Sequence, residues 1–453
     1  MALLTPWKIA EVTGGKFVGS QAQCEAPVAG AVRDNRDVAP GNLFVCFVGA
    51  RVDGHNFVND AFDRGAACCL VEREIDGAKG PCVVVPSTLD AIRQLGAYYR
   101  SLFDIPVIGI TGSVGKTSAK ELIAAVLSAK YSVHKTDMNL NNDIGVPLTL
   151  LSLNESHEVA VVEMGISDFG DMSRLAVMAR PDIFVMTKIG YSHIDNLGDL
   201  QGVLKAKTEA FPYMKPNGIA VMNGDDELLL SFATGKKTYT FGLMEHNDYR
   251  AENIKEQGID SITLNIKNNK ELFEIVIPAF GSHLSALAPA AAAVADLLGL
   301  SSDEVRRGFA SYSSVDGRAK VSSNEGVTLI DDCYNANPNS VKAALTSLSS
   351  LSGRRIAVLG DMLGLGEGAA EMHRDVGAFA ASCGIELLVC QGKESALFCE
   401  GYRASGGASS EHFEDFDKLL ESLPKIIKKG DAVLVKASRG MHFERLLPIF
   451  SQK

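Results

Sequence analysis

Short apolar runs alternate with segments of helical periodicity along most of the chain, a pattern typical of α/β proteins with mostly parallel sheets. Near the start, a helical pattern at 58–65 lies between two apolar runs, and another at 89–99 follows Ser87, a candidate N-cap. Strands are predicted here at 43–48, 68–72 and 82–86. These elements predict an α/β domain over residues 1–103.

Two further blocks repeat the alternation. In the middle block, two alternating runs within 259–277 predict an antiparallel hairpin added to a parallel sheet, and an alanine-rich helix at 290–298 closes the block. Its other strands are predicted at 105–110, 159–163 and 183–187. The last block predicts a helix at 340–351 and strands at 327–331, 355–360, 387–391 and 432–435. A linker-like stretch at 311–318 places the remaining domains at 104–315 and 316–453.

Composition excludes several classes of protein. A chain of 453 residues predicts about two to four domains. The net charge of −11 argues against a protein that binds nucleic acid, although it leaves room for a local anion site. Nine scattered cysteines without a C-x-x-C pair signal no zinc knuckle and suit a reducing compartment. With no secretory signal, and with the apolar stretch 284–300 interrupted by polar residues and a proline, we expect a cytoplasmic protein without membrane insertion.

The most informative segment is GITGSVGKT at 109–117, where an apolar strand runs into a glycine-rich turn and then a helix. Such a turn lets backbone N–H groups surround phosphate oxygens at a helix N-terminus. Lys116 would reach the β- and γ-phosphates, and the Thr117 hydroxyl would ligate Mg²⁺. The strict G-x-x-x-x-G-K-[ST] pattern fails because its first glycine falls on Ile110, yet the context predicts an ATP or GTP site.

A triphosphate site also needs a carboxylate for its metal, usually at the end of a neighbouring parallel strand. Glu163 closes the run VAVVE and is the candidate, although an ordinary glutamate at a strand end remains an alternative. His193 follows the next predicted strand and, taken alone, reads as an ordinary loop histidine.

Together with the phosphate loop, four short motifs resemble those of the Mur ligases, the ATP-dependent amide-forming enzymes of peptidoglycan synthesis. They are NLNND at 139–143, EMG at 163–165, YSHID at 191–195 and KAKTE at 205–209. Other stretches resemble the branch of that family that joins D-alanyl-D-alanine to UDP-N-acetylmuramoyl-tripeptide. They are DNR at 34–36, GARVDGHNF at 49–57, DDCYNANPNS at 331–340, LGDMLGLGE at 359–367 and KASRGMHFERL at 436–446.

The resemblance implies three α/β domains: a uridine-nucleotide-binding domain, a central P-loop ATPase domain with a mostly parallel sheet, and a C-terminal Rossmann-like domain. It also implies ATP and two Mg²⁺ ions as cofactors. The residues matched to the ATP phosphates are Gly112, Ser113, Val114, Gly115, Lys116, Thr117 and Ser118. Thr117 and Glu163 match ligands of one Mg²⁺, His193 matches a residue near the second, and Lys207 matches a lysine carried as a carbamate. Lys116, Lys207 and His193 are therefore the candidate catalytic residues.

The same resemblance implies substrate contacts in all three domains. Asp34, Asn35 and Arg36 match a uridine motif, and Asn139, Asn141 and Asn142 match a segment that lines the nucleotide-sugar substrate. Arg318, Asp332 and Asn335 match residues that reach ATP, while Asn337, Lys436 and Arg439 match the region near the dipeptide. For Asn335 and Asn337, a turn that caps the helix at 340–351 is an alternative interpretation that the match does not exclude.

Four positions depart from the family pattern, in which asparagine is usual at Lys188 and Leu287, serine at Asn35 and glutamate at Gly364. Leu287 matters most because the usual asparagine is associated with the adenine. Two alternatives remain. Folylpolyglutamate synthase, another amide ligase, would place its phosphate loop nearer the N-terminus, and a silent ATP-binding module would not need Lys116, Glu163, His193 and Lys207 together. No coiled-coil pattern indicates an oligomer, so we expect a monomer, and the third residue of the acceptor peptide is left open.

Overall fold

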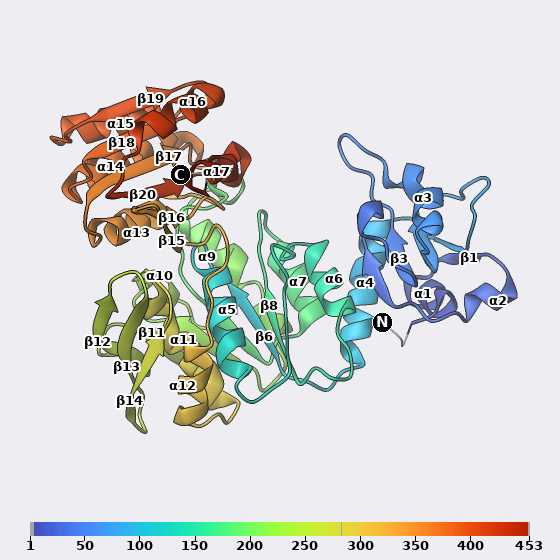
Figure 1. Ribbon diagram of the computed structural model, residues 1–453. Coiled ribbons are helices and arrows are strands. Elements are labelled where there is room, and N and C mark those ends of the chain that lie inside the picture. Colours follow the sequence, from blue (N-terminus) through green and yellow to red (C-terminus); the bar gives the residue numbers. More distant parts are fainter. Residues whose placement is uncertain (1–3, 282, 452–453) are drawn as a thin grey trace.

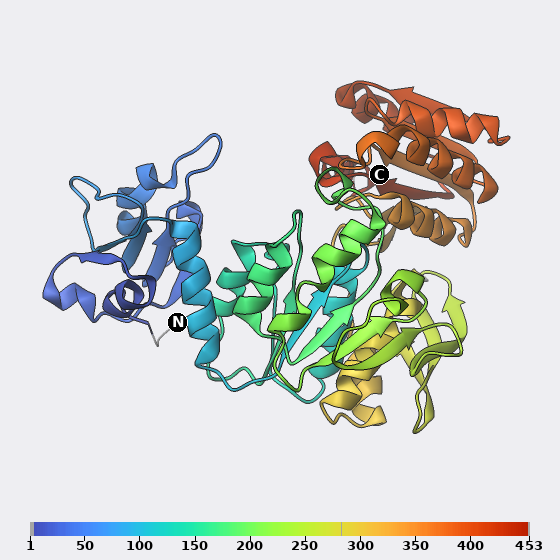
Figure 2. The ribbon, with the colours of Figure 1, turned by 180° about the vertical axis from the view of Figure 1, so that it is seen from behind.

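The computed structural model describes residues 4–281 and 283–451, which form three α/β domains, each built on its own sheet. Figures 1 and 2 show the second domain between the other two, in contact with both. The predicted fold class is confirmed. No helix within the described residues is long and apolar enough to cross a bilayer.

The first domain is a five-stranded sheet of order β1-β5-β4-β3-β2, parallel except for the β1–β5 pair. Its strands are β1 Lys16–Val18, β2 Gly30–Val32, β3 Asn42–Val45, β4 Cys68–Val71 and β5 Cys82–Val84. Its helices are α1 Pro6–Thr13, α2 Gln21–Cys24, α3 Val58–Asp63 and α4 Thr88–Ser101. The predicted strands and helices are present within a few residues, and the Ser87 hydroxyl caps α4 by accepting from the Asp90 N–H at 3.2 Å.

The second domain has a nine-stranded sheet of order β14-β13-β12-β11-β10-β9-β6-β8-β7. All neighbouring strands from β12 to β7 pair in parallel, and β13 and β14 add the predicted antiparallel hairpin. The strands are β6 Val107–Thr111, β7 Val133–Lys135, β8 Val159–Glu163, β9 Ile183–Met186, β10 Ile219–Asn223, β11 Lys237–Gly242, β12 Tyr249–Gln257, β13 Ser261–Lys267 and β14 Leu272–Ile277. Because β6 lies between β8 and β9, the loops after these three strands meet at one edge of the sheet.

Helices cover both faces of this sheet (Figure 1). They are α5 Lys116–Leu127, α6 Gly145–Leu151, α7 Asp171–Ala179, α8 Ile194–Leu197, α9 Leu200–Thr208, α10 Glu227–Leu230, α11 His283–Leu297 and α12 Ser302–Ala310. The helix predicted at 290–298 is wrong at its start, since α11 begins at His283 and runs through Pro289. A proline normally ends a helix, but α11 is buried almost all round in the apolar core with α5, and this packing keeps the helix continuous.

The third domain has a six-stranded sheet of order β15-β16-β20-β17-β18-β19, parallel except for the β15–β16 pair. Its strands are β15 Lys320–Asn324, β16 Val327–Asp331, β17 Arg354–Gly360, β18 Leu387–Gln391, β19 Ser410–Phe413 and β20 Asp431–Lys436. Its helices are α13 Pro338–Ser349, α14 Ala369–Ser382, α15 Ala396–Ala404, α16 Phe416–Ile426 and α17 Pro448–Ser451. Of the nine cysteines in the chain, all are free thiols and only Cys383 is not fully buried.

One apolar core joins the first and second domains. It runs from Leu43 and Leu70 of the first sheet, through Ile92 and Leu95 of α4, to residues of α6, α7 and β8. At the centre of this junction α4 and α6 approach closely, because a Cβ on Gly96 would lie 2.8 Å from the Cβ of Pro147. The third domain packs around two cores, one of which also contains Phe280 of the second domain and contacts Ile259.

Candidate active site

The phosphate loop is built as the sequence predicts, between β6 and α5. Its glycines are required by the backbone: Gly112 has φ +151°, and a Cβ there would lie 2.0 Å from the Thr187 hydroxyl. Gly115 has φ +84° and is the N-cap of α5, a conformation that L side chains rarely adopt. Thr117 is buried in the first turn of α5. The turn and the helix N-terminus form a site suited to phosphate oxygens.

The segment after β9 holds this loop in place. The Ser113 N–H donates to the Lys188 carbonyl at 2.7 Å, and the Ser113 hydroxyl donates to the Gly190 carbonyl at 2.8 Å. The Thr187 hydroxyl donates to the Val114 carbonyl at 2.6 Å. Lys188 takes part through its backbone alone while its side chain is exposed, so the departure from asparagine at this position leaves the contact intact.

Lys116 folds back over the loop, and its ammonium donates to the Gly112 carbonyl at 2.7 Å. Burial lowers its pKa, the charge of Glu163 partly opposes this, and the charge of Arg318 adds to the lowering. Glu163 and Arg318, which are far apart in the sequence, therefore act on the same ammonium. A negatively charged phosphate at the loop would favour the charged form of Lys116.

Glu163 lies at the end of β8 with 1% of its surface exposed. Its Oε1 accepts from the Asn141 amide at 2.7 Å, and its backbone N–H donates to the Thr136 hydroxyl at 2.9 Å. Its Oε2 is buried and has no hydrogen-bond partner among the described residues. Because an unpartnered buried carboxylate oxygen is costly unless something binds it, this atom fits a divalent cation.

Two other candidates, Lys207 and His193, face the same place. Lys207 in α9 is 2% exposed, and its ammonium has no hydrogen bond or ion pair to any described residue. Burial lowers the pKa of Lys207 well below its usual value, and the charge of Lys116 lowers it further. The pKa of His193 is lowered by desolvation first and then by the charges of Lys207 and Lys116. Three basic groups thus lie close enough to act on one another, and a polyanion between them would offset their repulsion.

Within residues 4–281 and 283–451, no three His, Cys, Asp or Glu side chains lie together as a metal cluster. The donors near the loop are Glu163, the Thr117 hydroxyl and the His193 imidazole. A magnesium ion held here would therefore complete its oxygen ligands from phosphate and water, as magnesium commonly does. The residues present fit such an ion, and a carboxylate on Lys207 would add one more oxygen ligand.

The third domain meets the second at the segment that holds the phosphate loop. A Cβ on Gly190 would lie 2.7 Å from the Asn339 amide of α13. In the linker, the Arg318 guanidinium stacks on the ring of Tyr334 at 3.9 Å, and Arg439 lies 5.3 Å from the same ring. These contacts bring the linker and the third domain toward Ser113 and Lys116.

The other third-domain candidates are held by local contacts. The buried Lys436 ammonium pairs with Asp332 Oδ2 at 2.5 Å and donates to the Asn335 carbonyl at 2.9 Å. Asn337 caps α13: its Oδ1 accepts from the Ser340 N–H at 2.9 Å. The capping interpretation of Asn337 is therefore confirmed, and its role toward substrate stays a prediction. Asn335 is exposed.

The predicted uridine motif lies in the first domain. Arg36 binds both oxygens of Asp34, at 2.9 and 2.6 Å, and this contact lowers the pKa of Asp34 to about 2. The Asn35 amide donates to Asp60 at 2.6 Å. These contacts lie within the first domain, and none joins this motif to the phosphate loop.

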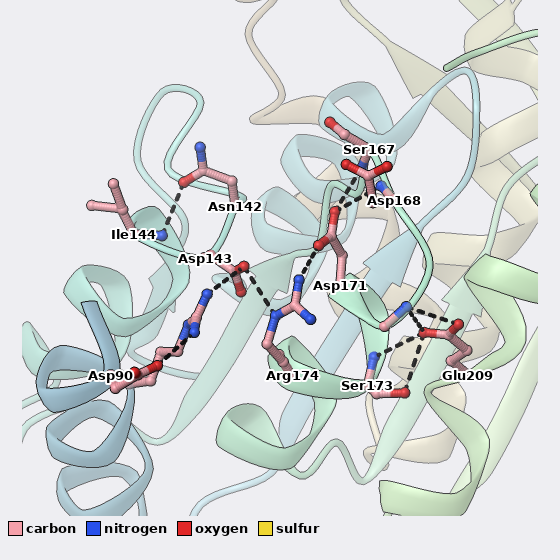
Figure 3. A network of polar contacts seen from close by, with 12 residues as sticks. Asp90, Asn142, Asp143, Ile144, Ser167, Asp168, Asp171, Ser173, Arg174 and Glu209 are labelled. Atoms are coloured by element: carbon pink, nitrogen blue, oxygen red, sulfur yellow. Dashed lines mark hydrogen bonds and ion pairs between the residues drawn. The ribbon is translucent and has the colours of Figure 1, made fainter. Parts of the chain in front are cut away.

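The asparagine segment follows β7 and lies at the junction of the first two domains. Asn141 contacts Glu163, Asn142 accepts from the N–H groups of Ile144 and Gly145 at the start of α6, and Asn139 is exposed. A cleft of about 240 Å³ opens beside Asn142, with Leu89 of α4 on its other side. Figure 3 shows the polar contacts around this cleft. The cleft is lined by Asn142, the chain neighbour of the residue that holds Glu163.

Three supporting residues were not found from the sequence. Thr136 and Thr187 act on Glu163 and on the phosphate loop through strand neighbours, which a local motif does not reveal. Lys120 is 1% exposed, and its ammonium donates to the Thr136 carbonyl at 2.8 Å. A signal for Lys120 did exist, because a lysine lies on the apolar face of α5 between Ala119 and Leu122.

Three stretches of the chain match family profiles. Their descriptions are Mur ligase family, catalytic domain (residues 27–100), Mur ligase middle domain (residues 110–295) and Mur ligase, glutamate ligase domain (residues 317–439). The UDP-N-acetylmuramoyl-tripeptide–D-alanyl-D-alanine ligase of Bacillus subtilis is 35% identical over 445 residues, which cover 97% of this chain and 96% of that protein.

Solved structures show the same relationship. MurF from Acinetobacter baumannii matches with a TM-score of 0.89 at 29% identity and 99% coverage of both chains. The MurF ligase of Thermotoga maritima, in complex with ADP, matches with a TM-score of 0.82 at 29% identity, covering 94% of this chain and 97% of that one. A folylpolyglutamate synthase of Mycobacterium tuberculosis reaches 0.63 at 18% identity, covering 80% and 94%, which is a likeness in fold alone.

Proposed function

The chain belongs to the Mur ligase family, and from this premise we propose that it joins D-alanyl-D-alanine to the tripeptide carboxylate of UDP-N-acetylmuramoyl-tripeptide with cleavage of ATP. The observation that carries the proposal is the full-length similarity to relatives named for this reaction, combined with a complete phosphate loop beside Glu163 and Lys207. The product is the last nucleotide-linked precursor with a pentapeptide.

The reaction must activate a carboxylate, which is a poor electrophile. Transfer of the γ-phosphoryl group of ATP to the tripeptide carboxylate gives an acyl phosphate and ADP. The free amine of D-alanyl-D-alanine then attacks the acyl carbon, the C–O bond to phosphate breaks, and the amine loses a proton. Inorganic phosphate leaves with the electron pair of that bond, so one amide is formed for each ATP cleaved.

The residues of this chain would bring two anions together and keep water away. The N–H groups of the loop and the Lys116 ammonium would bind phosphate oxygens, which reduces repulsion between the triphosphate and the carboxylate. Arg318 would add positive charge from the linker, since its charge already acts on Lys116. Packing of the third domain against Gly190 would help to exclude water from the acyl phosphate.

We propose Mg²⁺ as the second cofactor, with Thr117 and Glu163 holding one ion and His193 assisting a second. When bound, Mg²⁺ would supply charge neutralisation between the phosphates and the carboxylate. The unpartnered Oε2 of Glu163 supports this assignment. Thr136 contacts both Lys120 and Glu163, and these two contacts would keep the carboxylate at the end of β8.

We propose that Lys207 carries a carbamate in the active enzyme. Its lowered pKa favours the neutral amine, and this is the form that adds to CO₂, giving a carbamate and releasing one proton. The modification replaces an unpaired amine by an anion next to Lys116 and to any bound cation. An anion here is attracted where a cation is repelled, which is the physical reason to expect it.

The substrate would span the first two domains. Asp34, Asn35 and Arg36 would bind the uridine end, and Asn139, Asn141 and Asn142 would line the path of the sugar and peptide. Asn337, Lys436 and Arg439 would face the incoming dipeptide. Because every candidate group comes from one chain, we propose that the protein acts as a monomer, in the cytoplasm, where ATP and nucleotide sugars are supplied.

The test is phosphate release from ATP by the purified protein. Release should require both UDP-N-acetylmuramoyl-tripeptide and D-alanyl-D-alanine, and mass spectrometry should find the joined pentapeptide. Running the assay with lysine and with diaminopimelate as the third residue decides the acceptor. Release that occurs without the dipeptide, or that instead follows folate and glutamate, would refute the proposal.

Matched variants test the site. Lys207→Met should abolish ligation, whereas Lys205→Met, two residues earlier on α9 with an exposed side chain, should retain it. Glu163→Gln should lose metal-dependent turnover while still folding, because the amide keeps the size of the side chain and can still pair with Asn141.

A further inference from the structure

We propose that Arg93, Asp143 and Arg174 form an ion-pair bridge that ties the position of the first domain to the position of Glu163. In this proposal Arg93 and Asp143 are positioning residues for the ligation reaction, so it rests on the proposed function. The bridge would let occupancy of the first domain by the nucleotide-sugar substrate adjust the carboxylate at the end of β8.

The first link crosses between domains. Arg93 lies on α4, the last helix of the first domain, which packs on α6 and α7 of the second. Its NH1 donates to Asp90 Oδ1 on the same helix at 2.9 Å, and its NH2 donates to Asp143 Oδ2 at 2.7 Å. A shift of α4 therefore acts directly on Asp143.

The second link runs from Asp143 to Glu163. Asp143 directly follows the asparagine segment, in which the Asn141 amide holds Glu163 Oε1 at 2.7 Å. The backbone of the same asparagine accepts from the Gly165 N–H at 2.7 Å, just beyond Glu163. A displacement of Asp143 would thus be passed to the carboxylate through one side chain and one backbone contact.

The third link reaches Glu163 from its other side. Asp143 Oδ2 also accepts from Arg174 Nε at 3.1 Å, and Arg174 pairs with Asp171 at the start of α7. The Asp171 carboxylate accepts from the N–H groups of Ser167 and Asp168, at 2.8 and 2.9 Å, in the segment that follows β8. Figure 3 shows Arg174 between Asp143 and Asp171. The asparagine segment and the segment after β8 are therefore both linked to Asp143, the second of them through Arg174 and Asp171.

The Arg93–Asp143 pair lacks one of the two hydrogen bonds that it could form, so a second arrangement of the two side chains is available. Arg93 Nε and Asp143 Oδ1 are both buried and without a hydrogen-bond partner among the described residues. The two side chains make one bond, while an arginine and a carboxylate can make two parallel bonds when the fork is aligned. A small rotation of α4 that brings Nε onto Oδ1 would satisfy both atoms. The cleft of about 240 Å³ lies beside this bridge, so a substrate that fills the cleft can favour the aligned form.

A bridge with a purely structural role would make the same contacts. The test therefore needs a measurement that a purely structural role would leave unchanged. We suggest Arg93→Gln and Asp143→Asn, with Arg93→Lys as the conservative variant. The matched control is Arg374→Gln, which removes an exposed arginine–glutamate pair on the surface of the third domain. Thermal melting reports folding, and electron paramagnetic resonance reports binding of Mn²⁺ in the presence of ADP, independently of turnover.

We expect Arg93→Gln and Asp143→Asn to weaken Mn²⁺ binding by up to about tenfold, because removing a direct partner of a metal ligand costs about 10- to 100-fold and these residues act on Glu163 through Asn141. KM for the nucleotide-sugar substrate should rise in the same variants, Arg93→Lys should fall between them and the wild type, and Arg374→Gln should match the wild type. In an Asn141→Ala background the effect of Arg93→Gln should be smaller, because the side-chain contact to Glu163 is lost while the backbone contact to Gly165 and the route through Arg174 remain.

Unchanged Mn²⁺ binding and unchanged KM in folded Arg93→Gln and Asp143→Asn proteins would overturn the proposal. So would full additivity of Arg93→Gln and Asn141→Ala. Failure of the wild type to ligate the dipeptide would refute the proposed function instead, and the Mn²⁺ measurement would still report on the bridge. The two failures are therefore distinguishable.

Discussion

Lys207 gives the prediction that depends most directly on the structure. Its side chain is 2% exposed and its amine makes no hydrogen bond or ion pair to a described residue, and its pKa is lowered well below the usual value by burial and by Lys116. Methionine has a similar length and no charge to desolvate. We therefore expect Lys207→Met to abolish ligation and, without CO₂ and metal, to make the folded protein more stable than the wild type.

The magnitude follows from the unpaired amine. A fully buried polar group without a partner costs about 1–3 kcal/mol, which sets the upper limit of what the substitution removes at a side chain that is 2% exposed. For a domain of roughly 200 residues, each kcal/mol shifts the melting temperature by about 2–4 °C. Below the usual pKa of Lys207 the gain is larger, because folding must then also remove a proton from the amine.

The lowered pKa of Lys207 also determines how the stability of the wild type changes with pH. Because the pKa of Lys207 is lower in the folded state than its ordinary value of 10.5, the unfolded chain binds more protons between these two values. The stability of the wild type therefore rises with pH through this window, and the advantage of Lys207→Met narrows as the pH approaches 10.5.

The assay is calorimetric melting of the wild type, Lys207→Met and Lys205→Met in CO₂-free, metal-free buffer at several pH values. Lys205 is exposed on the same helix, so its variant should melt with the wild type. A lower melting temperature for Lys207→Met at every pH would refute the reasoning, since it would mean that the Lys207 ammonium has a stabilising partner in the folded state.

Three further predictions concern other parts of the site. Gly112→Ala should lose ADP binding by titration calorimetry, because its Cβ would lie 2.0 Å from the Thr187 hydroxyl; retained affinity would contradict the loop geometry. Asn337→Ala should destabilise the third domain by about 1 kcal/mol through loss of the helix cap, measured by urea unfolding, and Asn337→Ser should restore most of it. Arg36 lowers the pKa of Asp34 to about 2, so its stabilising contribution is present above about pH 4 and disappears as the pH falls through 2; melting of Asp34→Asn should converge with the wild type there.

Much of the fold could be predicted because buried parallel strands read as continuous apolar runs. The strands at 159–163, 327–331 and 387–391 have the predicted bounds. Among the described residues, eight strands were not predicted: β1, β2, β7, β10, β11, β12, β15 and β19. The second half of β12 and most of β15 are exposed, so neither carries an apolar run that separates it from a loop.

The candidate site divides in the same way. The phosphate loop and Glu163 follow from local patterns, since a strand, a glycine turn and a helix are adjacent in the sequence. The contacts of Thr136 and Thr187 depend on the strand order β9-β6-β8-β7, which places distant residues side by side. Tyr334 was also missed, because its stacking with Arg318 depends on how the linker turns back onto the third domain.

The shared core around α4 also limits how this protein can be rebuilt. The first domain cannot be exchanged as an independent unit, because its last helix packs against α6 and α7 in one apolar core. A chimera joined before Thr88 would have a first domain without α4 and would keep the original helix. A chimera joined after Ser101 would bring a foreign α4, which must still pack closely against Pro147 at the position of Gly96. Exchange of the first domain between related enzymes would therefore have to include α6 and α7 together with α4.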